Sequence, residues 1–345
     1  MTDWGSLPEA REDESKRMRI LVIGGTTFIG RHLVAQLAKL GHEVTILHRK
    51  AEHEFGKKVE NLQADRNDLT QLGRTLAGKK FDAVFDNAYD WERGTPASAV
   101  EGLGKLVCEQ VSRYVFMSSV AAYGDGLNHH EGDALAADDW PDRYARQKAQ
   151  SERALFKLHQ RYGLQAVTLR PPFIYGPGNP FYREQFFWDR LRDKRALVLP
   201  GDGRRLMQFL YVKDLVAAMV KALDTPTAVG HAFNIANPRA MTQAEVIDAL
   251  AAAAGKETKV VRIPRERILR TGGHPMGPHL YFGMYFDLPP ITLLVNKAQR
   301  ILAFKPCSFD EGLKETYKWY LRHHAKPDID YRFEDQLLGL SQMAS

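Results

Sequence analysis

The sequence predicts an α/β protein with a doubly wound parallel sheet and a smaller C-terminal lobe. Three observations support this fold class. Short apolar runs alternate with helix-like stretches from Met18 to Arg170, the order that gives a parallel sheet with helices on both faces. A glycine-rich turn joins the first run to the first helix. Prolines and glycines interrupt the alternation at 171–180, where we place the change of lobe.

The elements of the sheet can be justified in order. The first strand is expected at Met18 to Gly24, an apolar run closed by glycine. A helix follows from Phe28 to Leu40, because its apolar residues recur at three- and four-residue spacing and Gly41 stands where helices end. A strand at Glu43 to Leu47 comes next. The alternation then predicts helices at 69–76, 98–109 and 143–162 and strands at 83–86, 114–118 and 166–170.

The second half of the chain is less regular. We expect an aromatic helix at 181–191, a turn at 201–203 and a helix at 213–223 that returns to the first lobe. The stretch 264–290 is rich in glycine, proline and aromatic residues and indicates an irregular segment over a cleft. These patterns divide the chain into a flexible tail at 1–17, a first lobe at 18–177 that also receives about 205–240, and a second lobe over most of 178–345.

Length and composition restrict the class of protein. At 345 residues, with 44% hydrophobic and 26% charged residues, the chain can bury a sizeable core and is long enough for two lobes. Its 2 cysteines lie far apart, which excludes a disulfide framework and favours a reducing compartment. No secretory signal or membrane-length apolar run occurs, so we expect a cytoplasmic protein.

The formal net charge of +6 raises the question of nucleic acid. Lysine and arginine are interleaved with acidic residues along the chain, and no base-stacking motif accompanies them. A phosphate-bearing ligand explains the charge equally well. We therefore expect no nucleic-acid partner.

The glycine-rich turn, GGTTFIG from Gly24 to Gly30, is the first functional motif. Glycines between a strand and a helix let the backbone turn sharply and approach a pyrophosphate, whose charge the helix N-terminus favours. In a βαβ context this pattern predicts dinucleotide binding; a tight turn without a ligand is the alternative.

The end of the second strand bears on which dinucleotide binds. Proteins that bind NAD usually carry Asp or Glu about 20 residues after the glycine turn. Here His48 takes that position, and Arg49 and Lys50 follow, which suits the 2′-phosphate of NADP(H). We favour NADP(H) over NAD(H). If Arg49 and Lys50 belong only to a solvated loop, NAD(H) stays open.

A tyrosine, a lysine and two serines form the second functional motif. Tyr144 and Lys148 are four residues apart in a helix-like stretch and share one face. A neighbouring ammonium favours the phenolate, which would make Tyr144 an acid/base near neutrality. Ser118 and Ser119 follow a predicted strand at the edge where ligands of such sheets bind. Without the nucleotide turn, the Tyr and Lys would be read as an exposed helix face.

Together these motifs resemble the extended short-chain dehydrogenases/reductases, the superfamily of NAD(P)-dependent nucleotide-sugar epimerases and dehydratases, and the resemblance implies a Rossmann-type fold with a substrate-binding lobe. It covers nearly the whole chain. The matching segments are the glycine turn, Asp65 after the third strand, Ala88 after the fourth, SSVAAYG, the YxxxK at Tyr144, RPPFIYGPGN at Arg170, YVKDL at Tyr211 and FKPCSFDEGL near the C-terminus.

The resemblance implies a role for each site residue. Tyr144 would be the catalytic acid/base, Lys148 would hold the nicotinamide ribose, and Ser119 would orient the substrate, while Asp65 and Arg66 would lie near the adenine. The full set of implied cofactor contacts is Gly24, Gly25, Thr27, Phe28, Ile29, Gly30, His48, Arg49, Lys50, Asp65, Arg66, Ala88, Tyr144, Lys148 and Pro171.

Two departures from the family pattern concern the substrate. Thr27 replaces a glycine, and the GGTxFIG form resembles an atypical branch that includes chloroplast stem-loop-binding proteins, some of which act on RNA. Met207 stands where nucleotide-sugar enzymes carry a phosphate-binding arginine, with Arg204 and Arg205 slightly earlier, which argues against a diphosphate substrate. Aromatic residues of two segments could line a pocket for a less polar substrate or belong to the core: Phe186, Phe187, Trp188, Tyr281, Phe282, Tyr285 and Phe286.

We therefore predict an NAD(P)-dependent oxidoreductase that moves hydride to or from a carbonyl or alcohol carbon of a small molecule, aromatic or sugar-like. It would act as a reductase or dehydrogenase, or as an epimerase or dehydratase. The alternatives are a nucleotide-sugar epimerase/dehydratase with tightly held NAD, and a non-catalytic RNA-binding relative. The pairs His129–His130 and His323–His324 lack the context of a metal site, so no metal is expected. The helices at 98–109 and 143–162 are candidates for a homodimer interface, by analogy with the family.

Overall fold

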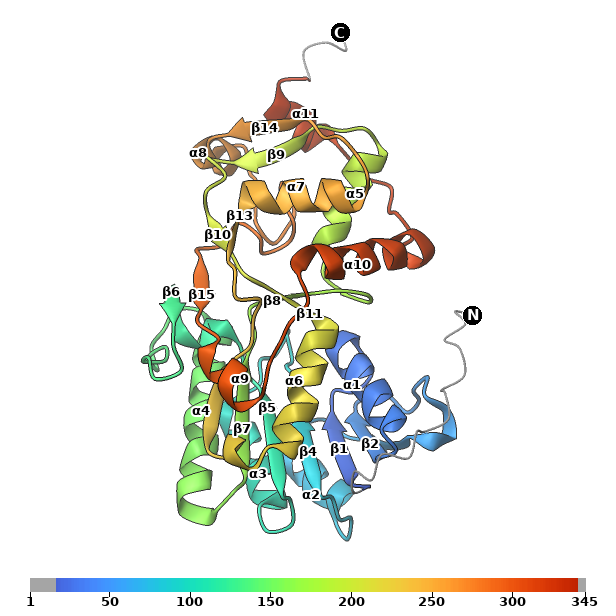
Figure 1. The fold of residues 1–345 in the computed structure, drawn as a ribbon, viewed down its shortest axis with the longest axis vertical. Helices are drawn as coiled ribbons and strands as arrows, with labels where there is room; N and C mark the ends of the chain where they lie inside the picture. Colours follow the sequence, from blue (N-terminus) through green and yellow to red (C-terminus); the bar gives the residue numbers. More distant parts are fainter. Residues whose placement is uncertain (1–16, 341–345) are drawn as a thin grey trace.

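The computed structural model describes residues 17–340, and a parallel sheet forms its lower lobe (Figure 1). The sheet has seven strands in the order β12-β7-β5-β4-β1-β2-β3. Their bounds are β1 (Arg19–Ile23), β2 (Glu43–His48), β3 (Glu60–Gln63), β4 (Ala83–Asp86), β5 (Arg113–Met117), β7 (Ala166–Arg170) and β12 (His231–Asn234). The chain winds outward in both directions from the neighbouring strands β1 and β4. Ligands of such sheets bind where the strand order reverses.

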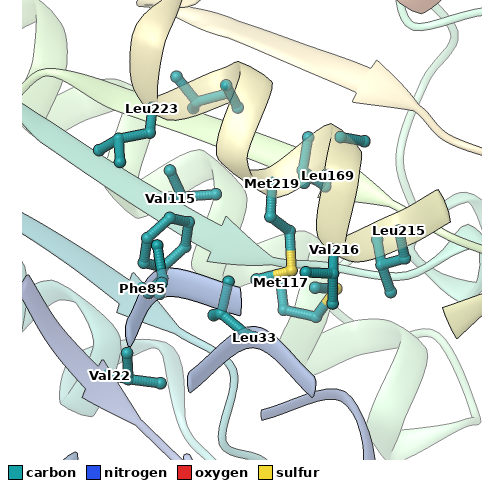
Figure 2. Packing of buried hydrophobic residues seen from close by; sticks show 14 of the residues in the cluster. Val22, Leu33, Phe85, Val115, Met117, Leu169, Leu215, Val216, Met219 and Leu223 are labelled. Carbon is teal, nitrogen blue, oxygen red and sulfur yellow. The ribbon is translucent and has the colours of Figure 1, made fainter. Parts of the chain in front are cut away.

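Helices cover both faces of the sheet. On one face α1 (Phe28–Lys39) packs against α6 (Val212–Asp224), and α9 (Asn296–Ile301) lies against β12. On the other face α2 (Leu69–Leu76), α3 (Ala97–Val107) and α4 (Arg143–Tyr162) pack in sequence. Figure 2 shows Leu33 of α1 and Met219 of α6 meeting Phe85 and Val115 of the sheet, all buried. Burying each such side chain contributes about 1.5–3 kcal/mol.

The upper lobe is built mainly from helices around an aromatic core. Its helices are α5 (Glu184–Arg192), α7 (Gln243–Ala253), α8 (Arg265–Arg270), α10 (Phe309–His323) and α11 (Arg332–Leu338). A short parallel pair, β9 (Leu197–Pro200) with β14 (Val260–Ile263), borders them. Capping boxes begin α7 at Thr242 and α10 at Ser308 and fix where these helices start.

Short strand pairs connect the lobes. β8 (Phe173–Tyr175) runs parallel to β11 (Phe209–Tyr211). β8 comes directly after β7 in the sequence, and β11 comes directly before α6. β6 (Gly126–His129) pairs with β15 (Ile291–Leu293), and β10 (Leu206–Met207) with β13 (Met241–Thr242). The loop at 176–183 therefore leaves the lower lobe beside the C-terminal ends of the sheet strands.

The predicted fold class, a doubly wound parallel sheet with a smaller second lobe, is confirmed. The helices expected at 69–76 and 143–162 match α2 and α4, and the helix expected at 213–223 is α6, which packs on α1. The aromatic helix begins at Glu184 rather than Phe181, because Asn179 and Arg183 first form tight turns. α9 lies against β12 of the sheet and β15 pairs with β6, although both elements follow 290 in the sequence. The expected tail falls almost wholly outside the described residues.

Three of the aromatic residues at 264–290 are core residues. Tyr281, Phe282 and Phe286 are almost fully buried in the upper lobe, so they do not line an open cleft. Asp287 holds this segment in place by accepting hydrogen bonds from Tyr281 and Arg265. Within the described part of the chain, no helix is long and apolar enough to cross a membrane.

Candidate functional site at the strand-order reversal

The glycine turn is held in a shape that only glycine allows. Gly24 has a φ of +79°, and a Cβ there would lie 3.1 Å from that of Ala88. A Cβ on Gly30 would lie 1.9 Å from the Gly24 carbonyl oxygen, so any side chain would push α1 away from the strand. Thr27 caps α1 without a side-chain hydrogen bond. The first amides of α1 therefore have no side-chain acceptor and could bind an anion.

Phe28 ties this turn to the upper lobe. Its backbone has a φ of +35°, which is rare for a bulky residue, and its ring packs in the upper-lobe core. The ring meets His32 edge-on at 6.4 Å, and His32 Nε2 lies 2.9 Å from the Pro177 carbonyl oxygen. The glycine turn and the loop between the lobes thus form one connected unit.

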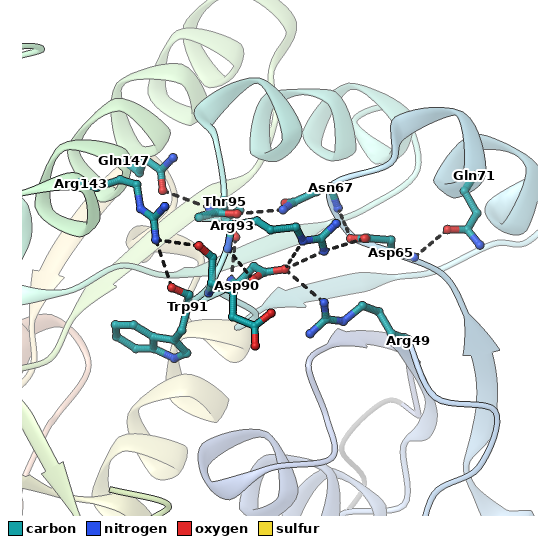
Figure 3. A network of polar contacts seen from close by, with 12 residues as sticks. Arg49, Asp65, Asn67, Gln71, Asp90, Trp91, Arg93, Thr95, Arg143 and Gln147 are labelled. Carbon is teal, nitrogen blue, oxygen red and sulfur yellow. Dashed lines mark hydrogen bonds and ion pairs between the residues drawn. The ribbon is translucent and has the colours of Figure 1, made fainter. Parts of the chain in front are cut away.

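A network of ions closes the site on the side of β2 and β3 (Figure 3). Arg49 Nη1 lies 3.2 Å from Asp90 Oδ2. Arg93 Nη2 lies 2.6 Å from Asp90 Oδ2 and 2.7 Å from Asp65 Oδ2. Burial of Asp65 opposes its ionisation, but hydrogen bonds from Asn67 and Arg93 hold its pKa below the usual value. The loop 87–96, which follows β4, is therefore pinned to the ends of β2 and β3.

His48 and Arg66 lie inside the protein. The His48 ring sits 6.5 Å from that of His53, and burial lowers its pKa. Arg66 forms a buried ion pair with Asp86, which also accepts a 2.7 Å hydrogen bond from Tyr114. Lys50 is exposed at the surface. Of the three residues at the end of β2, only Arg49 reaches the ion network.

Tyr144 and Lys148 face the serines at the end of β5. Lys148 is buried, its Nζ donates a 2.6 Å hydrogen bond to the Met117 carbonyl oxygen, and burial lowers its pKa to about 8. Nζ lies 5.7 Å from the centre of the Tyr144 ring. Burial raises the pKa of Tyr144 to about 12, and a hydrogen bond with Ser119 and the charge of Arg183 act in the opposite direction. The group that lowers the pKa of Tyr144 most is thus Ser119, whereas the sequence pattern suggested that the ammonium of Lys148 would lower it.

The two serines have different surroundings. Ser118 donates a hydrogen bond to the buried carboxylate of Glu152, which is ion-paired with Arg170. Ser119 instead accepts a hydrogen bond from the amide of Ala121 at 3.2 Å and faces Tyr144. Pro171 is buried behind this turn, and its carbonyl oxygen accepts a hydrogen bond from Val120. Ser119 is thus the serine placed to contact a ligand.

Aromatic side chains that the sequence patterns did not single out surround Tyr144. The Trp91 indole stacks on its ring at 4.9 Å with an angle of 23° between the planes, and Tyr89 meets the ring edge-on at 4.7 Å. Phe181 touches Trp91 edge-on at 5.7 Å. Trp91 is 53% exposed although it makes these contacts. Its position in the loop after the fourth strand, at the edge where ligands bind, was the available signal.

Neither Met207 nor Arg205 supplies a cation to this site. Met207 is buried in the upper-lobe core, and Arg205 is ion-paired with Asp287 at 3.1 Å. His129 and His130 both bind Asp133, and His324 binds Asp189. Among the described residues, no group of three or more potential ligands could hold a metal ion.

Comparison with known proteins places the chain in a family. The model of the NAD dependent epimerase/dehydratase family matches residues 20–236. The chain is 30% identical to the chloroplast stem-loop binding protein of 41 kDa b of Arabidopsis thaliana, over 94% of this chain and 85% of that protein. It is 25% identical to a UDP-N-acetyl-alpha-D-glucosaminuronate decarboxylase of Bacillus cytotoxicus, over 88% of this chain and 98% of that protein.

A solved structure agrees in fold. dTDP-glucose 4,6-dehydratase of Bacillus anthracis, in complex with NAD, matches with a TM-score of 0.72 and 19% identity, over 89% of this chain and 97% of that one. The family match covers more than half of the chain, which confirms the resemblance drawn from the motifs. The chain therefore belongs to the NAD-dependent epimerase/dehydratase family, whose dehydratase and reductase members are enzymes of the oxidoreductase type.

Proposed function

We propose that the chain transfers hydride between a nicotinamide cofactor and a carbonyl or alcohol carbon of a small molecule, with Tyr144 as the acid/base. The observation that carries the proposal is the juxtaposition of Ser119, Tyr144 and Lys148 at the end of the sheet where the glycine turn lies.

The residues fit a dinucleotide. The Thr27 side chain gives the α1 N-terminus no acceptor, and Gly30 leaves no room for a Cβ between turn and strand. In the described part of the chain, the side-chain amide of Asn87 has buried atoms without partners at the same edge. When bound, the nicotinamide would supply or accept the hydride.

Ser119 would orient the substrate oxygen, and Tyr144 would give a proton to that oxygen or take one from it. Lys148, held by the Met117 carbonyl, would bind a ribose hydroxyl and place positive charge near the phenol. The aromatic rings of Trp91 and Tyr89 would exclude water from the reacting atoms.

We further propose that NADP(H) is preferred over NAD(H). Arg49 lies at the end of β2, and Arg93 lies beside it across Asp90. A 2′-phosphate would replace Asp90 as the partner of Arg49. In calorimetric titrations with both cofactors, Arg49→Ala should weaken NADP(H) selectively, with Lys39→Ala, at an exposed lysine in the last turn of α1, as the surface control. Equal affinities of the wild type for both cofactors would contradict the preference.

The chemistry is tested by Tyr144→Phe. This variant should lose turnover while keeping cofactor affinity, because the phenol oxygen is removed and the ring remains. Undiminished turnover would refute the assignment. A net redox enzyme would consume NADPH stoichiometrically, whereas a redox-neutral epimerase or dehydratase would purify with its cofactor and need none added. RNA binding that falls steeply with salt, without any turnover, would favour the non-catalytic alternative.

Two further expectations concern the cell and the assembly. A cytoplasmic location would keep Cys108 and Cys307, both free thiols here, in the reduced state. α3 and α4 pack side by side, and their outer faces would meet those of a second copy in a homodimer. Sedimentation of the full chain would measure that state directly.

A further inference from the structure

We propose that Arg183 forms an oxyanion-binding subsite beside Tyr144, so that the substrate carries a carboxylate or phosphate group beside an apolar body. The inference rests on the proposed function, because Tyr144 marks where the substrate would react. No sequence motif singled out Arg183.

Arg183 lies among aromatic rings just before α5. The centre of its guanidinium is 4.6 Å from the ring of Phe181, 5.2 Å from Phe173 and 5.5 Å from Tyr285. These rings come from three separate segments that meet at the junction of the lobes. A ligand that reaches the guanidinium would therefore contact mainly apolar surface on its way.

Arg183 forms no ion pair with a carboxylate among residues 17–340. The residue is 9% exposed, Nε donates to the Met284 carbonyl at 3.2 Å, and Nη1 donates to the Ile174 carbonyl at 3.4 Å. Nη2 has no hydrogen-bond partner among residues 17–340. It is not one of the unpaired polar atoms that the protein encloses completely, so it keeps some access to solvent. One edge of the guanidinium is thus left for a ligand.

Most other buried arginines show the usual solution. Three of them pair with a buried carboxylate: Arg66 with Asp86, Arg170 with Glu152, and Arg190 with Glu334. Such pairing is common because an isolated buried charge is strongly unfavourable. Arg113 is the exception and donates to the Leu223 carbonyl. Arg183 also lacks an ion pair, and burial lowers its pKa to about 10. A bound oxyanion would supply the missing partner.

The neighbouring acid makes no direct pair with Arg183. Glu184 forms no ion pair with Arg183 in the described structure; its Oε2 accepts a 3.0 Å hydrogen bond from Asn179, and its Oε1 is enclosed without a partner. Burial raises the pKa of Glu184 to about 7, although the charge of Arg183 acts in the opposite direction. Glu184 is therefore ionised only in part near neutral pH and leaves the guanidinium edge open to another anion.

The subsite lies next to the reacting groups. The Phe181 ring lies 4.6 Å from the Arg183 guanidinium and meets Trp91 edge-on at 5.7 Å, and Trp91 stacks on Tyr144. The charge of Arg183 also lowers the pKa of Tyr144. A substrate of modest length could bind Arg183 through its oxyanion and present a carbonyl to Tyr144.

The test uses the full chain and three small probes of similar shape. Phenyl phosphate and benzoate carry the oxyanion, and benzamide is the neutral counterpart. Calorimetry on the wild type should show both anions binding at least about tenfold more tightly than benzamide. Equal binding of benzoate and benzamide would overturn the subsite without any variant, so the test does not depend on how a mutant folds.

Variants assign the effect to Arg183. Arg183→Met should weaken both anions at least about tenfold and leave benzamide unchanged, and Arg183→Lys should keep most of the affinity for phenyl phosphate. Arg192→Met, at an exposed arginine in the last turn of α5, the helix that Arg183 precedes, is the matched control. Unchanged anion binding by Arg183→Met would refute the proposal. A separate titration of the cofactor distinguishes the failure of this proposal from the failure of the proposed function. If the wild type does not bind the cofactor, the oxidoreductase proposal fails. The anion titrations still test the Arg183 subsite in that case.

Discussion

The indole of Trp91 lies stacked on the phenol ring of Tyr144, with the ring centres 4.9 Å apart. The loop that carries Trp91 is held from two sides: Arg143 donates to the Trp91 and Glu92 carbonyls at 3.1 Å, and Asp90 binds Arg49 (Figure 3). Trp91 lies over the phenol ring, and Arg49 is proposed to bind the 2′-phosphate. The two side chains are therefore connected through Asp90 and Trp91, neighbouring residues of one loop.

This connection predicts a fluorescence signal. Cofactor that engages Arg49 should shift the loop and change the emission of Trp91, because the indole is half exposed and stacked on another ring. Trp91→Phe should abolish the change, whereas Trp319→Phe, on α10 of the upper lobe, should keep it. A wild-type protein that binds cofactor by calorimetry with no change in emission would show that the loop does not move.

Asp90 should set the affinity for the phosphorylated cofactor. Its carboxylate already occupies Arg49 and Arg93, so Asp90→Asn should raise the affinity for NADP(H) by about tenfold or less and leave that for NAD(H) nearly unchanged. Glu92→Gln removes the same charge from the same loop and serves as the control. If both variants change NADP(H) affinity equally, the effect is one of net charge and not of the Arg49 pair.

The fold was predictable because its signals are local. The strand at 83–86 and the helices at 69–76 and 143–162 have bounds that apolar spacing gives directly. Gly24 and Gly30 were recognisable because a turn between strand and helix restricts the residue type. These properties depend on neighbours in the sequence.

The rest depends on contacts that no local pattern carries. Arg66 is buried because Asp86, a residue of another strand, faces it. Arg183 lies against aromatic rings from segments about a hundred residues apart in the sequence. α9 packs on the sheet after the chain has passed through the upper lobe. No sequence pattern connects Trp91 with Tyr144, because the two rings come together only when the loop is folded.

The buried ammonium of Lys148 should make stability depend on pH. Its pKa is about 8 in the folded chain and that of a free lysine is near 10.5, so between these values the unfolded chain binds more protons. The free energy of unfolding should therefore rise with pH in this window, by up to about 3 kcal/mol from this group. Chemical denaturation of the wild type and of Lys148→Met at pH 8 and pH 9.5 measures the difference. A slope that survives in the variant would assign the effect to other groups.

Two glycines should respond oppositely to the same substitution. Gly30→Ala places a methyl group 1.9 Å from the Gly24 carbonyl oxygen and should destabilise the protein by about 2 kcal/mol or more while removing cofactor binding. Gly73→Ala, in the middle of α2 with open space around its Cβ, should stabilise by about 0.5–1 kcal/mol. Thermal and urea unfolding of both variants provide the comparison, and tolerance of Gly30→Ala would mean that the turn can relax.

The adjacent serines should separate stability from catalysis. Ser118 bonds the buried Glu152, so Ser118→Ala leaves that carboxylate short of a donor and should destabilise by about 1–3 kcal/mol. The same variant should keep its kcat at temperatures where it is folded, since the Ser118 hydroxyl bonds Glu152. Ser119→Ala should change stability little, because the bonds of the Ser119 side chain within residues 17–340 are those with the Ala121 amide at the turn and with the phenol. It should instead lower kcat by about tenfold or more, because the substrate oxygen and Tyr144 lose their shared partner. Steady-state kinetics and urea unfolding of the two variants, measured side by side, test these roles. A Ser118→Ala variant that is folded but inactive would contradict the assignment of Ser118 to stability and Ser119 to catalysis.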